Sequence, residues 1–240
     1  MADKQVKAEQ TDAADVVEKA KGFWAAYSKR IIIVGSILIA LMGGFLGYKY
    51  LVTIPNEKTA NDLIFPAEKL FGLMAGSSTY NKDTVNMVLN GDKAAGVTGL
   101  LKIANSYGRT KPGNRAQYMI GACYLNLKQF DKAISHLKDF DANGATQIQS
   151  KAYLLLGHAY AEQKKTDDAL DYYQKAASVS DLDEAMASEA LFMAGRYADA
   201  MGKTKEATEF FQKLKDKYPA SQRVSSGEVD KYLASLGVAK

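Results

Sequence analysis

The segment that decides the fold is LGHAYAEQKKTDDALDYY, residues 156–173. An equivalent segment lies 36 residues earlier, at 120–137 (IGACYLNLKQFDKAISHL), and a third lies 38 residues later, at 194–211 (AGRYADAMGKTKEATEFF). Each copy has a glycine at its second position and an alanine 12 residues after that glycine. Three copies at such a period are typical of a helical repeat array.

Each copy is predicted to form two helices joined by a polar turn. Apolar residues recur at helical spacing on both sides of the turns LKQFDK, EQKKTDD and MGKTKE. The glycine of the first helix and the alanine of the second are expected where the two backbones approach most closely, with Tyr160, Tyr173 and Phe211 in the wider gaps. We therefore predict an all-α chain in which residues 114–220 form an α-solenoid.

The flanking regions also favour helices. Residues 53–113 are predicted to form a more divergent helical pair, whose first helix Pro66 should kink or begin anew. The segment 77–92 is long and polar for a helical connection, so we interpret it as a candidate functional loop. At the other end, residues 221–240 place Val229, Tyr232, Leu233 and Leu236 at helical spacing and predict a capping helix.

An uncharged apolar stretch near the N-terminus predicts a membrane anchor. Residues 31–48 span about 27 Å as a helix, and the helix can continue to residue 52 because Lys49 can extend its charged end to the interface. Trp24 and Tyr27 precede the stretch, whereas Tyr48 and Tyr50 end it, as aromatic residues do at the two membrane surfaces. A cleaved signal peptide is the alternative, but its apolar core would be shorter and a small-residue cleavage site would follow.

The flanking charges predict the orientation of this span. Four cations (Lys19, Lys21, Lys29 and Arg30) lie closely before it, and only Lys49 and Lys58 lie soon after it. By the positive-inside rule, residues 1–30 should be cytoplasmic and everything after residue 52 should lie outside the cytoplasm. From Val16 to Tyr27 the apolar residues of the cytoplasmic segment have helical spacing and predict an amphipathic helix, whereas its first dozen residues are predicted to be disordered.

Small residues recur along one face of the predicted span. This face could pack against another transmembrane helix, because small side chains allow close backbone approach; the alternative is that glycine is simply common in such helices. The residues of this transmembrane packing face are Ser36, Ala40, Gly43, Gly44 and Gly47.

The sequence carries no recognisable catalytic, cofactor or metal motif. It lacks HExxH, GxxxxGK[ST], GxSxG and GxGxxG after a strand, and it has two histidines and one cysteine, Cys123. The 31 Lys and Arg are balanced by 27 Asp and Glu along the chain, which argues against nucleic-acid binding. We predict no catalytic residue, no cofactor and no metal; the remaining enzymatic hypothesis would make His158 essential for a turnover.

The order of small residue, aromatic residue, alanine, aromatic residue and closing proline (Pro219) resembles the tetratricopeptide repeat. The spacings of 36 and 38 exceed the usual 34, and Ala198 stands where the earlier copies have a tyrosine. The resemblance implies that the first helix of each pair lines a concave surface that binds peptides or partner proteins. Its groove-facing positions correspond here to Arg115, Tyr118, Asn126, Lys151, Leu154, His158, Glu162, Glu189, Phe192, Arg196 and Asp199.

The combination of anchor, exported orientation and repeat domain resembles the YfgM-like family of ancillary subunits of the SecYEG translocon. Segments at 90–114, including NGD and YGRTKPGN, contribute to this resemblance. It implies a single-pass protein of the bacterial inner membrane with a periplasmic repeat domain. The implied partners are the SecYEG translocon, a membrane-anchored peptidyl-prolyl isomerase and emerging secreted polypeptides. A scaffold for envelope assembly or cell division is the alternative function, using the same groove.

Overall fold

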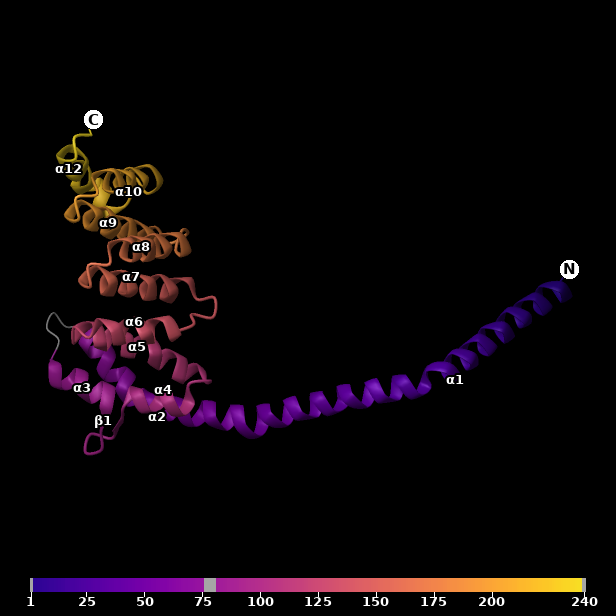
Figure 1. The fold of residues 1–240 in the computed structure, drawn as a ribbon. Helices are drawn as coiled ribbons and strands as arrows, with labels where there is room; N and C mark the ends of the chain where they lie inside the picture. The colour runs from indigo at the N-terminus through magenta and orange to yellow at the C-terminus, as the bar shows by residue number, and fades with distance from the viewer. Residues whose placement is uncertain (1, 76–80, 239–240) are drawn as a thin grey trace. The chain divides into compact units, whose positions relative to one another are not determined.

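The structure is a computed structural model that describes residues 2–75 and 81–238. In the described residues it is all-α apart from one hairpin, whose two strands have two residues each. The chain divides into two compact units, Met1–Pro55 and Asn56–Lys240. The first unit contains helix α1 (Ala2–Tyr48) and a π-helical turn, η1 (Lys49–Thr53). Figure 1 shows the elements of both units in chain order.

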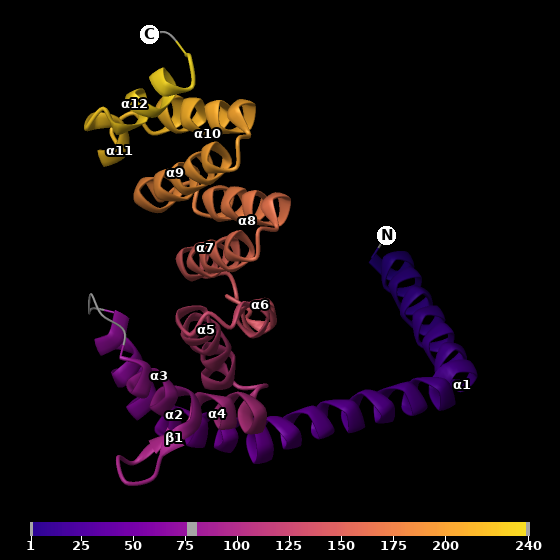
Figure 2. The same ribbon diagram turned by 60° about the vertical axis from the view of Figure 1, so that its left-hand side comes forward.

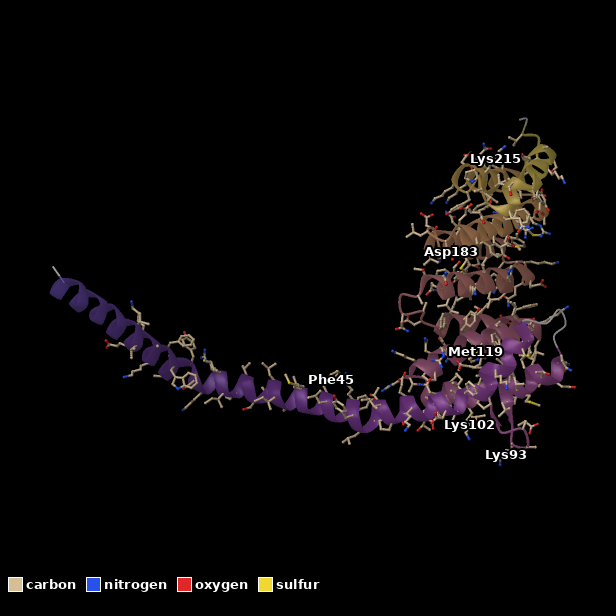
Figure 3. All side chains as sticks on the ribbon, turned by 180° about the vertical axis from the view of Figure 1, so that it is seen from behind. Phe45, Lys93, Lys102, Met119, Asp183 and Lys215 are labelled. Carbon is tan, nitrogen blue, oxygen red and sulfur yellow. The ribbon has the colours of Figure 1, made fainter. Side chains whose placement is uncertain are left out.

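Helix α1 carries the apolar stretch, and the large apolar side chains of that stretch are exposed. Ile39 is 73% exposed and Phe45 is 65% exposed, and Figure 3 shows the side chains around Phe45 projecting outward from the helix. The continuous helical segment Val16–Met74, which includes the apolar stretch, is long and apolar enough to cross a bilayer. This helix is a candidate membrane span, on the basis of its length and composition.

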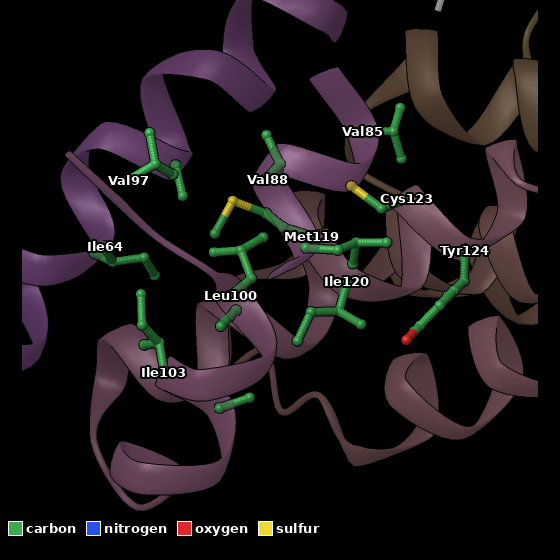
Figure 4. Close-up of a cluster of buried hydrophobic side chains, with 14 of the residues drawn as sticks. Ile64, Val85, Val88, Val97, Leu100, Ile103, Met119, Ile120, Cys123 and Tyr124 are labelled. Atoms are coloured by element: carbon green, nitrogen blue, oxygen red, sulfur yellow. The ribbon is translucent and has the colours of Figure 1, made fainter. Parts of the chain in front are cut away.

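The second unit begins with α2 (Ile54–Ala75), α3 (Lys82–Asn90), the hairpin β1 (Gly91–Asp92) and β2 (Val97–Thr98), and α4 (Leu100–Tyr107). These elements meet α5 (Lys111–Asn126) around one apolar core. Figure 4 shows Ile64 of α2, Val88 of α3, Leu100 of α4 and Met119 of α5 converging there. Burial of these side chains provides the main stabilisation of this end of the unit.

One expectation for this region was wrong. The segment 77–92 is not an irregular loop, because its residues 82–90 form α3 with Val85, Val88 and Leu89 buried; residues 76–80 lie outside the described residues. Of the two alternatives for Pro66, a new helix start is excluded, because Pro66 lies inside α2.

The rest of the unit consists of stacked helix pairs. They are α5 with α6 (Phe130–Asp139), α7 (Thr146–Glu162) with α8 (Thr166–Val179), and α9 (Glu184–Ala200) with α10 (Thr204–Lys217). Figure 2 shows α5, α7 and α9 along one side of the array and α6 and α8 along the other. Two short helices, α11 (Gln222–Ser225) and α12 (Glu228–Ser235), follow, and α12 covers the last pair with Val229 and Leu233.

The glycine of each first helix lies against a side chain 16 residues later. A Cβ at Gly157 would lie 2.5 Å from Cδ1 of Tyr173, and a Cβ at Gly195 would lie 2.7 Å from Cε1 of Phe211. The same relation joins Gly121 to Leu137, at 2.5 Å from Cγ. The glycines therefore make room chiefly for large side chains of the second helix. At Gly121 a Cβ would also lie 3.2 Å from the backbone oxygen of Ala133, which is the predicted approach between the glycine and the alanine.

Candidate functional site

An open groove of about 770 Å³ runs across the first helices of the three pairs. We call it the α5–α7–α9 groove. Four of the predicted groove-facing residues line it: Asn126 from α5, His158 and Glu162 from α7, and Arg196 from α9. Residues from three helix pairs thus form one continuous surface, which is the form of site that binds an extended segment or a partner helix.

His158 is fixed in the wall of this groove by Tyr173 of α8. Its Nδ1 lies 2.8 Å from the Tyr173 hydroxyl, and the two rings meet edge to face at 5.4 Å between centroids. Burial lowers the pKa of His158, although the nearby carboxylates of Glu162 and Glu189 act in the opposite direction. Burial also raises the pKa of Tyr173, so its hydroxyl remains protonated and can donate a hydrogen bond.

Arg115 and Tyr118 lie in a second hollow, of about 540 Å³, between α5, α2 and the α6–α7 connection. Arg115 donates from Nε to Glu68 Oε1 at 2.8 Å and from Nη2 to Asn61 Oδ1 at 3.2 Å. Side chains of α2 therefore already hold the guanidinium of Arg115. The structure does not bring these two residues into the α5–α7–α9 groove.

The remaining predicted positions are also outside that groove. Phe192 is fully buried, where it packs edge to face against Phe211 and Tyr232. Glu189 accepts two hydrogen bonds from Arg223 of α11, each at 3.1 Å. Leu154 is partly buried against the core, Lys151 is exposed and Asp199 is half-buried, and none of the three lines the groove.

The sequence reasoning missed the residues that the turns and the neighbouring helix positions bring to the groove. Lys128 and Lys164 come from the turns between paired helices, and Met193 and Tyr197 lie one residue beyond predicted positions Phe192 and Arg196 on α9. The signal was present in the turns NLKQF and EQKKT, where a lysine occupies the same place in two copies.

The described residues, 2–75 and 81–238, contain no group of three or more His, Cys, Asp or Glu side chains arranged to hold a metal ion. Cys123 is buried at 1% exposure, and burial raises the pKa of its thiol to about 12. The side chains that line the α5–α7–α9 groove offer hydrogen bonds, charge and apolar contact.

Three segments of the chain match models of a known repeat. Residues 150–180 match one model of the tetratricopeptide repeat, and residues 115–143 and 189–221 match a second. These segments are tetratricopeptide repeats. Each match covers most of one helix pair, so the chain is an all-α protein with a tetratricopeptide-repeat solenoid, as predicted.

Solved structures show a distant similarity as well. A crystal structure of MamA is 19% identical with a TM-score of 0.46, and the similarity covers 68% of this chain and 88% of that chain. A structure described as "MamA RS-1 ArsTM double mutant" is 19% identical with a TM-score of 0.42, covering 69% and 96%. No curated protein matches the sequence. Tetratricopeptide repeats are scaffolds for protein–protein interaction, and three of them form the groove described here.

Proposed function

We propose that this protein is a membrane-anchored scaffold that binds partner proteins through the α5–α7–α9 groove and catalyses no reaction. The observation that carries the proposal is the open groove to which three consecutive repeats contribute side chains. A tethered groove holds its partner close to the membrane, which raises the effective concentration of one for the other.

The more specific proposal is an ancillary subunit of the SecYEG translocon in the bacterial inner membrane. In this proposal the repeat domain is periplasmic and binds a membrane-anchored peptidyl-prolyl isomerase, assisting secreted chains as they emerge. The similarity of the whole architecture to the YfgM-like family supports it. The small-residue face of Ser36, Ala40, Gly43, Gly44 and Gly47 would contact the transmembrane partner.

Purification of the full chain in mild detergent, followed by mass spectrometry, tests this assignment. We expect translocon subunits and an isomerase to be recovered with the wild type and to be depleted by Glu162→Ala combined with Arg196→Ala. The matched control is Asp168→Ala with Lys205→Ala, which removes the same charges from exposed positions on the second helices. Recovery of wall or division proteins instead would favour the envelope scaffold, and equal recovery with both double variants would contradict a role for the groove.

The proposed orientation is testable by thiol labelling, since Cys123 is buried and leaves little background. Ala25→Cys lies before the span and Ser178→Cys lies in the repeat domain, both at exposed positions. A membrane-impermeant maleimide should label the Ser178→Cys variant in spheroplasts and label the Ala25→Cys variant only after detergent is added. The reverse pattern would show that the repeat domain is cytoplasmic.

A further inference from the structure

The turns between paired helices share one backbone motif, but they differ in the residue that occupies its left-handed position. In the first turn Gln129 N–H bonds to Tyr124 C=O at 2.9 Å, and Lys128 N–H bonds to Leu125 C=O at 3.0 Å. The second and third turns repeat this pair of bonds, at Lys164 and Lys165 and at Gly202 and Lys203. This is the Schellman motif, in which the residue after the helix cap adopts a left-handed conformation.

Glycine is the residue that this position favours, because it has no Cβ to clash in the left-handed region. The third turn has Gly202 at φ 72°, whereas the first two have Lys128 and Lys164, each at φ 58°. Lysine therefore stands twice where the backbone disfavours it, at equivalent points of consecutive repeats. Strained non-glycine residues of this kind tend to occur where their side chains have a function.

Both lysines line the α5–α7–α9 groove, which makes them candidates for binding whatever occupies it. Arg196 adds a third cation to the lining, and Glu162 is the one acidic side chain among the described residues that form it. Within the described part of the chain, neither lysine forms a salt bridge or a side-chain hydrogen bond. The lining thus carries three cationic side chains against one carboxylate, which is an excess of positive charge.

The groove also offers apolar surface between these charges. Phe130, Met193 and Met201 line it, and Met201 is 44% exposed. Methionine side chains are flexible and adapt to varied apolar partners. A complementary occupant must therefore combine carboxylates with apolar side chains.

Resting on the proposed function, we propose that the groove selects an acidic, amphipathic polypeptide segment, whose carboxylates bind Lys128, Lys164 and Arg196 and whose apolar side chains lie on Phe130, Met193 and Met201. The two turn lysines determine this preference. Electrostatic complementarity of this type mainly confers specificity and an association rate that falls with salt.

The test measures binding of three fluorescent peptides to the full chain in detergent by anisotropy. One peptide has Glu and Asp between Leu and Phe residues, the second has Gln and Asn in place of the acids, and the third has Lys. We expect the acidic peptide to bind at least ten-fold more tightly than the amide peptide, with the difference shrinking as salt is raised. Equal affinities would overturn the proposal.

The variants separate a binding role from a structural one. Lys128→Asn with Lys164→Asn keeps a residue that tolerates the left-handed conformation, so the Tm should be unchanged or higher while affinity for the acidic peptide falls at least five-fold. Lys128→Glu with Lys164→Glu should reverse the preference toward the basic peptide. The matched control is Lys93→Asn with Lys102→Asn, at exposed positions of the hairpin and of α4 (Figure 3), which should leave affinity unchanged.

The outcomes also distinguish this inference from the proposed function. If the Lys128 and Lys164 variants bind the acidic peptide as the wild type does, the lysines serve the helix ends alone and the inference is wrong. Partner recovery that still depends on Glu162 and Arg196 would then leave the scaffold function standing. If no peptide binds, the inference is likewise wrong, and partner recovery alone decides the proposed function.

Discussion

At the scale of single residues, the absence of a side chain at Gly157 allows α7 and α8 to pack together. Gly157 lies against the ring of Tyr173, which is 3% exposed and is hydrogen-bonded to His158. One methyl group at residue 157 would have to displace a packed aromatic ring, because interiors have no spare volume for it.

We predict that Gly157→Ala lowers the free energy of unfolding by about 1–3 kcal/mol, through overpacking against Tyr173. Chemical denaturation of the full chain in detergent would measure this. Gly72→Ala is the control, because a Cβ at Gly72 in α2 meets nothing within 4 Å. Alanine is the better helix former, so the control should be neutral or more stable. Equal destabilisation by both substitutions would contradict the packing argument.

His158 should make stability dependent on pH. Because burial lowers the pKa of His158 in the folded chain, the unfolded chain binds a proton more readily as pH falls below about 6.5. Its contribution is therefore complete above that pH and is lost as the pH falls toward the folded pKa. We expect the Tm difference between pH 7.5 and pH 5.5 to be smaller in His158→Gln than in the wild type.

His136 must be separated from this effect, since burial lowers its pKa as well. The variant His136→Gln, and both substitutions together, should each reduce the pH dependence, with the double variant showing the weakest dependence. An unchanged Tm difference in His158→Gln would show that protonation of this ring is not linked to folding.

At the scale of elements, α3 shows how a short helix can escape sequence reasoning. Its nine residues include polar positions throughout, and Val85, Val88 and Leu89 become a recognisable stripe only when the helix is placed against α4 and α5. The signal at its start was Asn81, whose side chain accepts hydrogen bonds from Asp83 N–H at 2.8 Å and Thr84 N–H at 3.3 Å.

We predict that Asn81→Ala lowers the free energy of unfolding by about 0.5–2 kcal/mol, because the first N–H groups of α3 lose their acceptor. Hydrogen exchange should be faster at Asp83 and Thr84 than in the wild type. Asn86→Ala changes an exposed position inside the same helix and should be neutral or stabilising. Faster exchange in both variants would mean that the cap is not the cause.

Some predicted groove-facing residues line the groove and others do not, and the reason depends on the element that carries each residue. The structure brings His158, Glu162 and Arg196 together in one hollow, because α7 and α9 follow the regular repeat. Phe192 follows the same pattern and is nevertheless buried, since Arg223 lies 4.3 Å from its ring centroid and α12 brings Tyr232 against it. The contacts of a capping element are not local in sequence, so the repeat pattern could not reveal them.

At the scale of the whole molecule, the repeat period was predictable, but the contacts at the two ends of the array were not. Gly121, Gly157 and Gly195 mark three pairs without reference to any structure. The first core instead joins α2 to α5 across a long stretch of sequence, and Glu57 of α2 accepts a hydrogen bond from Lys111 N–H at the start of α5. Helical periodicity gives the buried face of each element but does not determine which elements meet.

The cap at the C-terminal end should matter for the whole array. Val229 and Leu233 of α12 are 0% and 5% exposed and cover the third repeat. We predict that Val229→Ala with Leu233→Ala lowers the free energy of unfolding by about 3–6 kcal/mol through lost burial and cavity formation, and increases the binding of a hydrophobic dye.

The control changes the exposed face of the same helix, with Lys231→Ala and Ser235→Ala. These substitutions should leave stability within about 0.5 kcal/mol of the wild type. Similar losses in both double variants would mean that α12 contributes through its helical structure and not through the surface that it covers.

Several polar contacts between repeats join residues 36 positions apart: Lys203 to Asp167, Gln147 to Asp183, and Lys217 to Asp181. Contacts that reach only the neighbouring repeat allow a chain to fold in the order of its synthesis, because a repeat can pack without any segment that is distant in sequence. Residues up to about 140 can complete the first core while later ones are still being made. Helix α12 is made after the pair that it covers, so until α12 is synthesised the third repeat presents its apolar face to any neighbouring chain or chaperone.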